Sequence, residues 1–446
     1  MDKSNSFGTE PLPKLLRQQA IPASIGILIL SIYGIIDTIF VGRWVGSNGI
    51  AAITVVMPIT FLIASIGMSI GVGGASIISR ALGEGKPNKA FRAFGNQMML
   101  TGTLAILMGV LGFIFMDQVL FAFGGKGGVL QPAREYFEIL LYGVPFLAWA
   151  MMSNNVIRAV GFPRVAMFTL ITPAIANIIL DPIFIVGLDM GIKGAAWATT
   201  ISYIASATYA TWFFVSGKSD LKLSTDHLAP DWPIIREIAS IGSVTLARQG
   251  TISVLSIVLN NSLFAYGGEL ALSVYGIINR LMMFLNFPVL GITQGFVPIV
   301  GYNFGAKLFD RVKGIINLSI RSASIIALGI FALIMIFTRP LVGIFTSDVQ
   351  LITETVPAIR MAFLATPLLA ISLLGSAYFQ AIGKALPALL LALTKQGFFL
   401  IPLVLLLPLL FDLTGVWIAF PIADMGAAAI SYYYLRKSTQ STLTNV

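Results

Sequence analysis

Apolar stretches about 20 residues long recur along almost the whole chain, from residue 21 to residue 435. One such stretch is enough for an α-helix to cross the hydrocarbon core of a bilayer, whereas a membrane β-barrel would show alternating segments of about 10 residues. Only 11% of the residues are charged and the mean hydropathy is +0.89, whereas soluble domains carry about 25% charged residues. The sequence therefore predicts an all-α membrane protein.

Twelve apolar spans can be delimited along the chain. Their ranges are 21–42, 50–79, 90–116, 134–158, 164–188, 190–215, 236–265, 270–302, 311–337, 354–382, 385–411 and 413–435. A polar stretch near the midpoint divides the spans into two sets of six. The expected parts are an N-terminal segment (1–20), an N-lobe (21–215), a linker (216–235), a C-lobe (236–435) and a tail (436–446).

The basic residues are distributed unevenly between the two sides of this predicted topology. Of the 28 Lys and Arg residues, three lie inside spans and nineteen fall on the side that holds both termini. The opposite side has only six, which are Arg43, Lys126, Arg134, Lys193, Arg339 and Arg360. Because the cytoplasmic loops of membrane proteins carry the excess of Lys and Arg, we expect a cytoplasmic-membrane protein with both termini in the cytoplasm. This bias accounts for the net charge of +9, so no nucleic-acid partner is expected.

Short motifs recur between the two halves with a nearly constant offset. Gly83 in ALGEGKPNKA matches Gly305 in NFGAKLFDRV, and Gly161 in IRAVGFP matches Gly383 in FQAIGKA at the same separation along the chain. The motifs GAAWA and GVWIA recur at a separation that is shorter by a single position. Two copies of a six-helix unit enter the membrane in the same direction, so a pseudo-two-fold axis along the membrane normal is expected. Transporters with internal repeats bind substrate near mid-membrane between the repeats, so the duplication favours a transporter.

Two acidic residues, Asp37 and Asp181, stand out within the spans of the N-terminal half. Each has a polar residue one helical turn before it, Tyr33 before Asp37 and Asn177 before Asp181, so each pair shares a helix face. Pro182 follows Asp181 and cannot donate a backbone hydrogen bond, so a kink and a free carbonyl group are expected there. These features are typical of intramembrane acids that face the protein interior.

A carboxylate at the centre of a membrane helix costs about 2.5–3.5 kcal/mol on insertion scales, so we interpret both acids as functional. Burial disfavours the charged form of a carboxylate, and a second carboxylate close by disfavours it further. Such a pair can take up a proton near neutral pH, or can stay charged and hold Na⁺ together with nearby oxygen atoms. We predict an H⁺ or Na⁺ site at Asp37, Asp181 and Asn177. In the alternative interpretation each acid only caps or hydrogen bonds a neighbouring helix.

The ionisable residues inside the C-terminal spans are mostly basic. Lys395 and Asp424 can form a buried ion pair, whereas Arg248 and Arg280 can bind carbonyl groups or lie toward the cytoplasmic end. Asn279, Asn286 and Thr293 follow a seven-residue spacing that keeps them near one helix face, where they can line a cavity or bond neighbouring helices. Methionines nearby would give such a cavity adaptable walls. The expected substrate cavity comprises Asn279, Arg280, Asn286, Met282, Met283 and Lys395.

The motifs IIDTIFVGRWVG, NIILDPIFIVG and FQAIGKALPA, together with the six-plus-six arrangement of spans, resemble the multidrug and toxic compound extrusion (MATE) family over nearly the whole chain. The resemblance implies an antiporter with a V-shaped cavity between its lobes. Such a protein expels amphipathic, often cationic drugs or toxic metabolites in exchange for H⁺ or Na⁺. We expect it to act as a monomer, with no cofactor other than Na⁺ at the coupling site.

The resemblance also implies a set of coupling residues. In the branch of the family that couples through the N-lobe, the site corresponds to Asp37, Asp181, Asn177, Tyr33, Tyr136, Asn154 and Thr199. Tyr136, Asn154 and Thr199 rest on the resemblance alone. Another branch has an acid in the seventh span, where this chain has Arg248. This departure favours coupling in the N-lobe.

Export is not the one function that this sequence allows. A lipid-linked saccharide flippase of the wider superfamily would need cations around a pyrophosphate, and Arg248, Arg280 and Lys395 are candidates. A channel or a membrane enzyme is not favoured, because no constellation of nucleophile, base or metal ligands is found. The chain has no Cys, and its one His lies in the polar linker, which excludes disulfides and thiolate metal sites.

Overall fold

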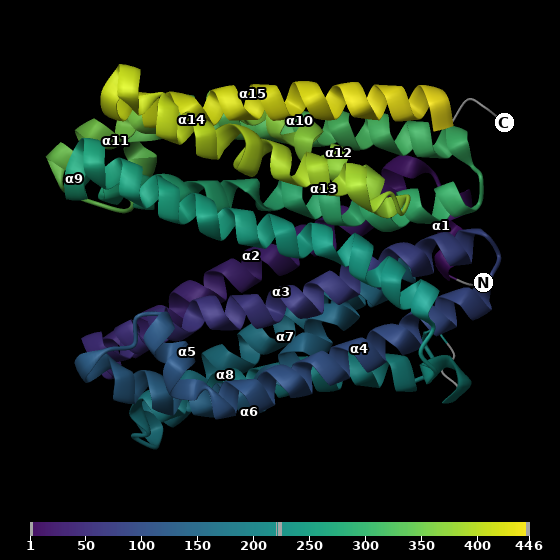
Figure 1. The fold of residues 1–446 in the computed structure, drawn as a ribbon, viewed down its shortest axis with the longest axis horizontal. Helices are drawn as coiled ribbons and strands as arrows, with labels where there is room; N and C mark the ends of the chain where they lie inside the picture. The colour runs from purple at the N-terminus through teal and green to yellow at the C-terminus, as the bar shows by residue number, and fades with distance from the viewer. Residues whose placement is uncertain (1–2, 220, 222–224, 443–446) are drawn as a thin grey trace. The chain divides into compact units, whose positions relative to one another are not determined.

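The computed structural model describes residues 3–219, 221 and 225–442, which form long helices joined by short turns (Figure 1). The helices divide into two compact units. Unit 1 comprises Met1–Phe7 and Ile25–Gly242, and unit 2 comprises Gly8–Ser24 and Ser243–Val446. The remaining parts of the predicted N-terminal segment, linker and tail (1–2, 220, 222–224 and 443–446) lie outside the described residues.

Unit 1 contains most of the predicted N-lobe. After a short α1 (Ser6–Thr9), its helices are α2 (Leu12–Trp44), α3 (Ser47–Gly83), α4 (Pro87–Ile114), α5 (Met116–Ala122), α6 (Leu130–Ala159), α7 (Pro163–Asp181) and α8 (Gly191–Val215). Buried apolar side chains from α3, α6 and α8, such as Val56, Phe137 and Ala195, form its core. The core therefore packs against the helices that carry the polar residues described below.

Unit 2 contains most of the predicted C-lobe. Its helices are α9 (Trp232–Gly305), α10 (Phe309–Gly343), α11 (Val349–Ala362), α12 (Leu369–Ala381), α13 (Ala385–Leu393), α14 (Ile401–Leu406) and α15 (Pro408–Thr442). Leu259, Ile278 and Val404 are among the fully buried residues of its core.

Ten helices in the described part of the chain are long and apolar enough to cross a membrane. Two features account for the twelve predicted spans. Helix α9 contains two spans, because Gly268 (φ 62°) interrupts its helical geometry between the predicted segments 236–265 and 270–302. Helix α8 has 25 residues, enough to span, but it is less apolar because it buries Thr199 and Ser202 among other hydroxyl groups. The all-α, twelve-helix, two-lobe prediction is confirmed.

The backbone also repeats between the two halves. Residues with left-handed backbone conformation (positive φ) recur in the two halves as four pairs. Three pairs have the offset of the sequence motifs, and the fourth is shorter by a single position. These pairs are Gly46 and Gly268, Gly85 and Lys307, Gly161 and Gly383, and Gly191 and Asp412. Because a left-handed residue marks a specific turn, four equivalent turns indicate that the two halves follow the same path.

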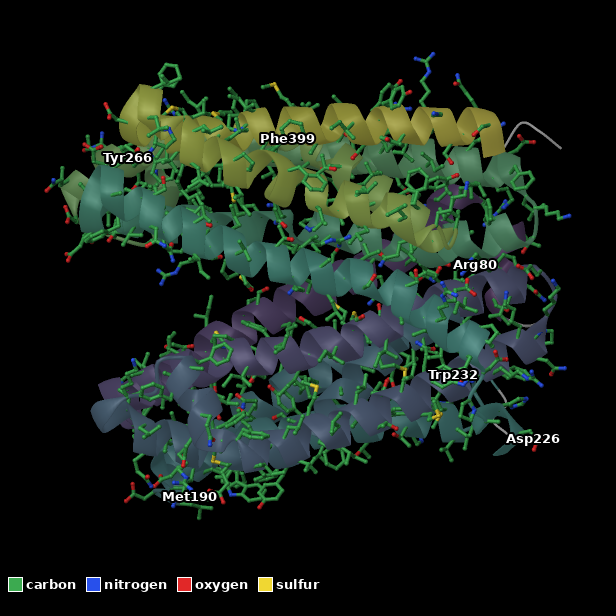
Figure 2. All side chains as sticks on the ribbon, in the orientation of Figure 1. Arg80, Met190, Asp226, Trp232, Tyr266 and Phe399 are labelled. Atoms are coloured by element: carbon green, nitrogen blue, oxygen red, sulfur yellow. The ribbon has the colours of Figure 1, made fainter. Side chains whose placement is uncertain are left out.

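Helix α9 begins in unit 1. A Cβ atom at Gly242 would lie 2.7 Å from the carbonyl oxygen of Ser69 on α3, and one at Gly73 would meet the backbone of Ile238, so only glycine permits this close approach. Arg80 of α3 donates to Glu237 of α9 at 2.7 Å, not far from the start of α9 at Trp232 (Figure 2). The first turns of α9 are therefore part of unit 1.

Helix α2 shows the reciprocal arrangement, because its first turns belong to unit 2. A Cβ atom at Gly295 of α9 would lie 2.9 Å from the backbone nitrogen of Ala20. Gly73 and Gly295 are separated by the offset of the repeat, so both contacts use the same position of the repeated unit. The structure thus differs from the predicted boundaries: α2 begins at Leu12 rather than residue 21, and the units divide within helices at 24/25 and 242/243.

Candidate functional site

Asp37 and Asp181 come together inside unit 1. Asp37 lies on α2 and is 7% exposed, while Asp181 is the last residue of α7 and is fully buried. Their carboxyl groups interact directly. If one of them carries a proton, it can donate an O–H···O hydrogen bond to the other.

The chain departs from α-helical geometry immediately after Asp181. Pro182 has no N–H to donate, and residues Pro182–Gly187 form a π-helical turn. Helix α8 holds this turn closely, because a Cβ atom at Gly194 would lie 2.9 Å from the carbonyl group of Phe184. Widened turns of this kind are rare and occur frequently at functional sites. The predicted break after Asp181 is therefore a change from α- to π-geometry.

Buried polar side chains from three helices surround the acids. Asn177 of α7 donates from Nδ2 to Oγ1 of Thr199 on α8 at 3.3 Å. The hydroxyl group of Tyr136 on α6 interacts with Thr199 and with both carboxyl groups. All three residues are at most 5% exposed. Thr199 therefore connects Asn177 with Tyr136 beside the two carboxyl groups.

Two further tyrosines border the acids. Tyr33 interacts electrostatically with both Asp37 and Asp181, and Tyr203 interacts with Asp37. Sequence reasoning did not identify Tyr203. It lies four residues after Thr199 on α8, so the one-turn spacing that linked Tyr33 to Asp37 was the signal that could have found it.

Several oxygen atoms of this cluster are buried without a hydrogen-bond donor among the described residues. They are Oδ1 of Asp37, both carboxyl oxygens of Asp181 and Oδ1 of Asn177. A buried acceptor without a partner costs about 1–3 kcal/mol, and more when it is charged. A proton or a hard cation such as Na⁺ would satisfy these atoms, since oxygen ligands are those that hard cations take. The donor set fits the predicted H⁺ or Na⁺ site.

Asn154 lies elsewhere in unit 1. Its Nδ2 donates to Oγ1 of Thr169 at 2.8 Å and to the carbonyl group of Ala166, while its Oδ1 accepts from Arg158 at 2.9 Å. It follows Tyr136 by about five turns of α6, or about 27 Å of helix. The structure therefore does not bring Asn154 to the acid cluster, where the resemblance had placed it. It joins α6 to α7 instead.

In unit 2, Lys395 and Asp424 form the ion pair that their sequence positions allow. Lys395 lies on the π-helical turn Thr394–Leu400, and its Nζ is 2.5 Å from Oδ1 of Asp424 on α15. The side chain of Asp424 is only 6% exposed and that of Lys395 is 24% exposed. Arg248 donates to Oγ of Ser376 at 3.3 Å. Two of the three candidate cations for a pyrophosphate are thus engaged within unit 2.

The other residues predicted for a substrate cavity lie on the second half of α9. Asn279, Arg280 and Met283 are exposed, whereas Met282 packs against the core of unit 2. Asn286 is half-buried, and its Oδ1 has no hydrogen-bond partner among the described residues. Lys395 comes from a different element, and its Nζ pairs with Asp424.

Comparison with known proteins identifies related sequences. The MatE family model matches residues 22–183 and again residues 246–406, once in each half of the chain. The multidrug export protein MepA of Staphylococcus aureus is 30% identical over 436 residues, covering 96% of this chain and 95% of that protein. MepA of Staphylococcus saprophyticus is 29% identical and covers 93% and 92% of the two chains.

Solved structures agree with these sequence matches. A crystal structure of MATE in complex with MaL6 superposes with a TM-score of 0.93 and 25% identity, covering 100% of both chains. A transporter of the MOP superfamily from Pyrococcus furiosus superposes with a TM-score of 0.92 and 25% identity, covering 99% of this chain and 98% of that chain.

Proposed function

This chain belongs to the MatE family, and on that premise we propose that it is an antiporter that exports amphipathic, often cationic compounds in exchange for H⁺ or Na⁺. As a member of this family it is a multi-pass membrane transporter rather than an enzyme, and its relatives are multidrug exporters. The proposed coupling site is the pair Asp37 and Asp181, with Asn177, Thr199, Tyr136 and Tyr33 around it.

One observation carries the proposal, namely the buried oxygen atoms of Asp37, Asp181 and Asn177 that have no donor among the described residues. Two neighbouring carboxylates in a buried site repel each other and lose hydration, so the pair gains free energy by taking up a positive ion. The same charge would attract a cationic compound. Ion and cargo then exclude each other by direct competition or through a change in the shape of unit 1, and binding of the ion from outside leads to release of the cargo.

The test is efflux of a fluorescent cationic dye from vesicles that contain the full-length protein, under separate H⁺ and Na⁺ gradients. We expect one of the two gradients to drive efflux, and Asp37→Asn and Asp181→Asn to lower the driven rate at least about tenfold, which corresponds to about 1.4 kcal/mol. The control is Asp117→Asn, because Asp117 is an exposed residue paired with Arg134 at 3.6 Å. Full driven efflux in both coupling variants would refute the coupling site.

We also propose that both termini lie in the cytoplasm, because nineteen basic residues fall on that side against six on the other. A reporter fused after the last residue should then be active only in the cytoplasm. An external signal would overturn the charge-based orientation and would leave the coupling proposal untouched.

A further inference from the structure

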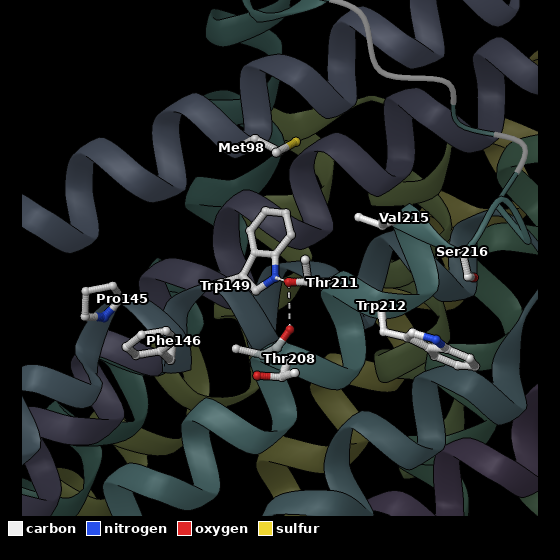
Figure 3. Close-up of a pocket in the computed structure, with 10 residues that line it drawn as sticks. Met98, Pro145, Phe146, Trp149, Thr208, Thr211, Trp212, Val215 and Ser216 are labelled. Carbon is white, nitrogen blue, oxygen red and sulfur yellow. Dashed lines mark hydrogen bonds between the residues drawn. The ribbon is translucent and has the colours of Figure 1, made fainter.

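A groove on the surface of unit 1 is lined by a different set of residues from the acid cluster. It has a volume of about 730 Å³ and is formed by α4, α6 and α8 (Figure 3). Phe146, Trp149 and Trp212 form its aromatic walls. The indole N–H of Trp149 donates to Oγ1 of Thr211 at 2.9 Å, so this donor is satisfied within the wall. The groove therefore presents a mainly apolar surface of the size that small-molecule sites have.

The length and position of the groove match one leaflet of a bilayer. It follows α8 from Ala207 to Ser216, which is about 14 Å at 1.5 Å per residue. One leaflet contributes about half of the hydrocarbon core, or about 15 Å. Helix α8 and the predicted span 190–215 both end at Val215, so in the predicted topology one end of the groove lies at the membrane boundary and the other extends toward the midplane.

A cationic side chain lies at the boundary end of the groove. The Nζ atom of Lys218 is 4.3 Å from the centre of the Trp212 ring. Lys218 takes part in none of the seven ion pairs found in the described part of the chain. Lys and Trp side chains together at a helix end are typical of the headgroup region. Lys218 is therefore positioned for an anion at the membrane surface.

We propose that this groove binds an anionic glycerophospholipid of the cytoplasmic leaflet. One acyl chain lies along Phe146, Trp149 and Trp212, and the phosphate group contacts Lys218. Bulk lipid tails are as apolar as the groove, so burial alone selects nothing. The selection comes from the shape of the aromatic walls and from the charge of Lys218. The cytoplasmic leaflet follows from the proposed orientation, in which α8 ends on the side of both termini.

The test is native mass spectrometry of the full-length protein in detergent, titrated with phosphatidylglycerol or with phosphatidylcholine of the same chains. We expect tighter binding of phosphatidylglycerol. Lys218→Gln should weaken that binding about fivefold and remove the difference between the lipids, as the contribution of one Lys near an anionic surface implies. Thr208→Phe places a ring in the groove and should weaken both lipids.

The matched control is Lys126→Gln. The Nζ atom of Lys126 lies 4.5 Å from the centre of the Phe121 ring, so it has the same kind of cation–π contact but is not part of the groove. Lipid binding should stay unchanged in this variant. Equal binding of the two lipids, or unchanged binding in Lys218→Gln and Thr208→Phe, would overturn the proposal. The proposal would also be overturned if a lipophilic cationic dye displaced the lipid and Lys218→Gln did not change this displacement. That result would identify the groove as a drug site. None of these outcomes depends on the coupling site.

Discussion

In unit 1, Asp37 and Asp181 lie against each other among tyrosine and amide groups, whereas in unit 2 Asp424 lies against Lys395. Both sites are buried and both adjoin a π-helical turn. With the offset that relates Gly194 to Gly415, Asp424 is the counterpart of Tyr203, which borders Asp37. The same helix position thus contributes to a charged site in both units.

The difference between the two sites lies in where the positive charge comes from. Unit 2 supplies it from its own chain, so the charge on Asp424 is balanced in every state that keeps the pair together. Among the described residues of unit 1, no cationic side chain pairs with the two acids. Four buried oxygen atoms, three on the acids and one on Asn177, have no hydrogen-bond donor there. A cation supplied by a side chain, as in unit 2, gives a structural site. Acids without a cationic side chain, as in unit 1, can bind an exchangeable ion instead.

The largest expected effect is on stability, from Lys395→Met. Removal of one partner of a buried pair leaves an uncompensated charge and costs about 3–5 kcal/mol. The double variant Lys395→Met with Asp424→Leu should recover most of this loss, because apolar side chains can replace a buried pair at little cost. Unfolding in detergent measures both.

The control for this experiment is Lys193→Met. Lys193 lies 3.9 Å from Glu135, but its side chain is 55% exposed, and such a surface pair contributes about 0–1 kcal/mol. A loss in Lys395→Met no larger than in Lys193→Met would show that the pair in unit 2 is not a structural charge, and the comparison with unit 1 would fail.

The next effect is the response of stability to the coupling ion. If Na⁺ is that ion, the wild-type protein should gain about 2.7 kcal/mol at a Na⁺ concentration of ~100 times Kd. Asp37→Asn should abolish the gain, and Asp424→Asn should keep it. Choline at equal ionic strength controls for screening. If H⁺ is the ion, deprotonation of the two neighbouring acids should lower the stability as the pH rises, and Asp37→Asn should reduce this fall. Loss of the response in Asp424→Asn alone would place the exchangeable ion in unit 2.

The helices of both units were largely predictable because membrane spans are long, apolar and repeated. Spans and turns follow from apolar runs and from glycines such as Gly161 and Gly383. The boundaries of the units did not follow, because they depend on which helices approach each other. Gly73 and Gly295 show no partner in the sequence, yet they allow the starts of α9 and α2 to pack into the opposite unit.

The acid cluster was predictable to a different degree for each residue. Asp37 and Asp181 stood out because carboxylates are costly in membrane spans, and one-turn spacing added Tyr33 and Asn177. Tyr203 was missed because a tyrosine in an apolar helix is ordinary in sequence. Asn154 shows the limit of a family motif, because the motif names a residue but does not give its distance from the other site residues along the helix.

A smaller effect of opposite sign is expected for Asp181→Asn. The amide removes one of two facing negative charges, so we expect the ion-free protein to gain about 1 kcal/mol of stability while ion-driven efflux is lost, as is common when a functional site is relaxed. Thermal unfolding without Na⁺ measures the first and the dye assay the second. The contrast with Lys395→Met is then one of sign, and a destabilisation of several kcal/mol in Asp181→Asn would mean that this acid is structural as well.

The smallest effect concerns Tyr203, which occupies the position in the repeated unit that Asp424 occupies in unit 2. Tyr203→Phe removes a hydroxyl group beside Asp37 but keeps the ring, so it should change ion affinity by about 0.5–1.5 kcal/mol, or roughly two- to tenfold, with little change in stability. Tyr142→Phe is the control, because Tyr142 is 53% exposed and its ring stacks on Trp197. The concentration of ion that gives half-maximal driven efflux measures the effect. An unchanged value in Tyr203→Phe would mean that Tyr203 only packs against its neighbours. The equivalent helix position would then contribute to a charged site in unit 2 alone.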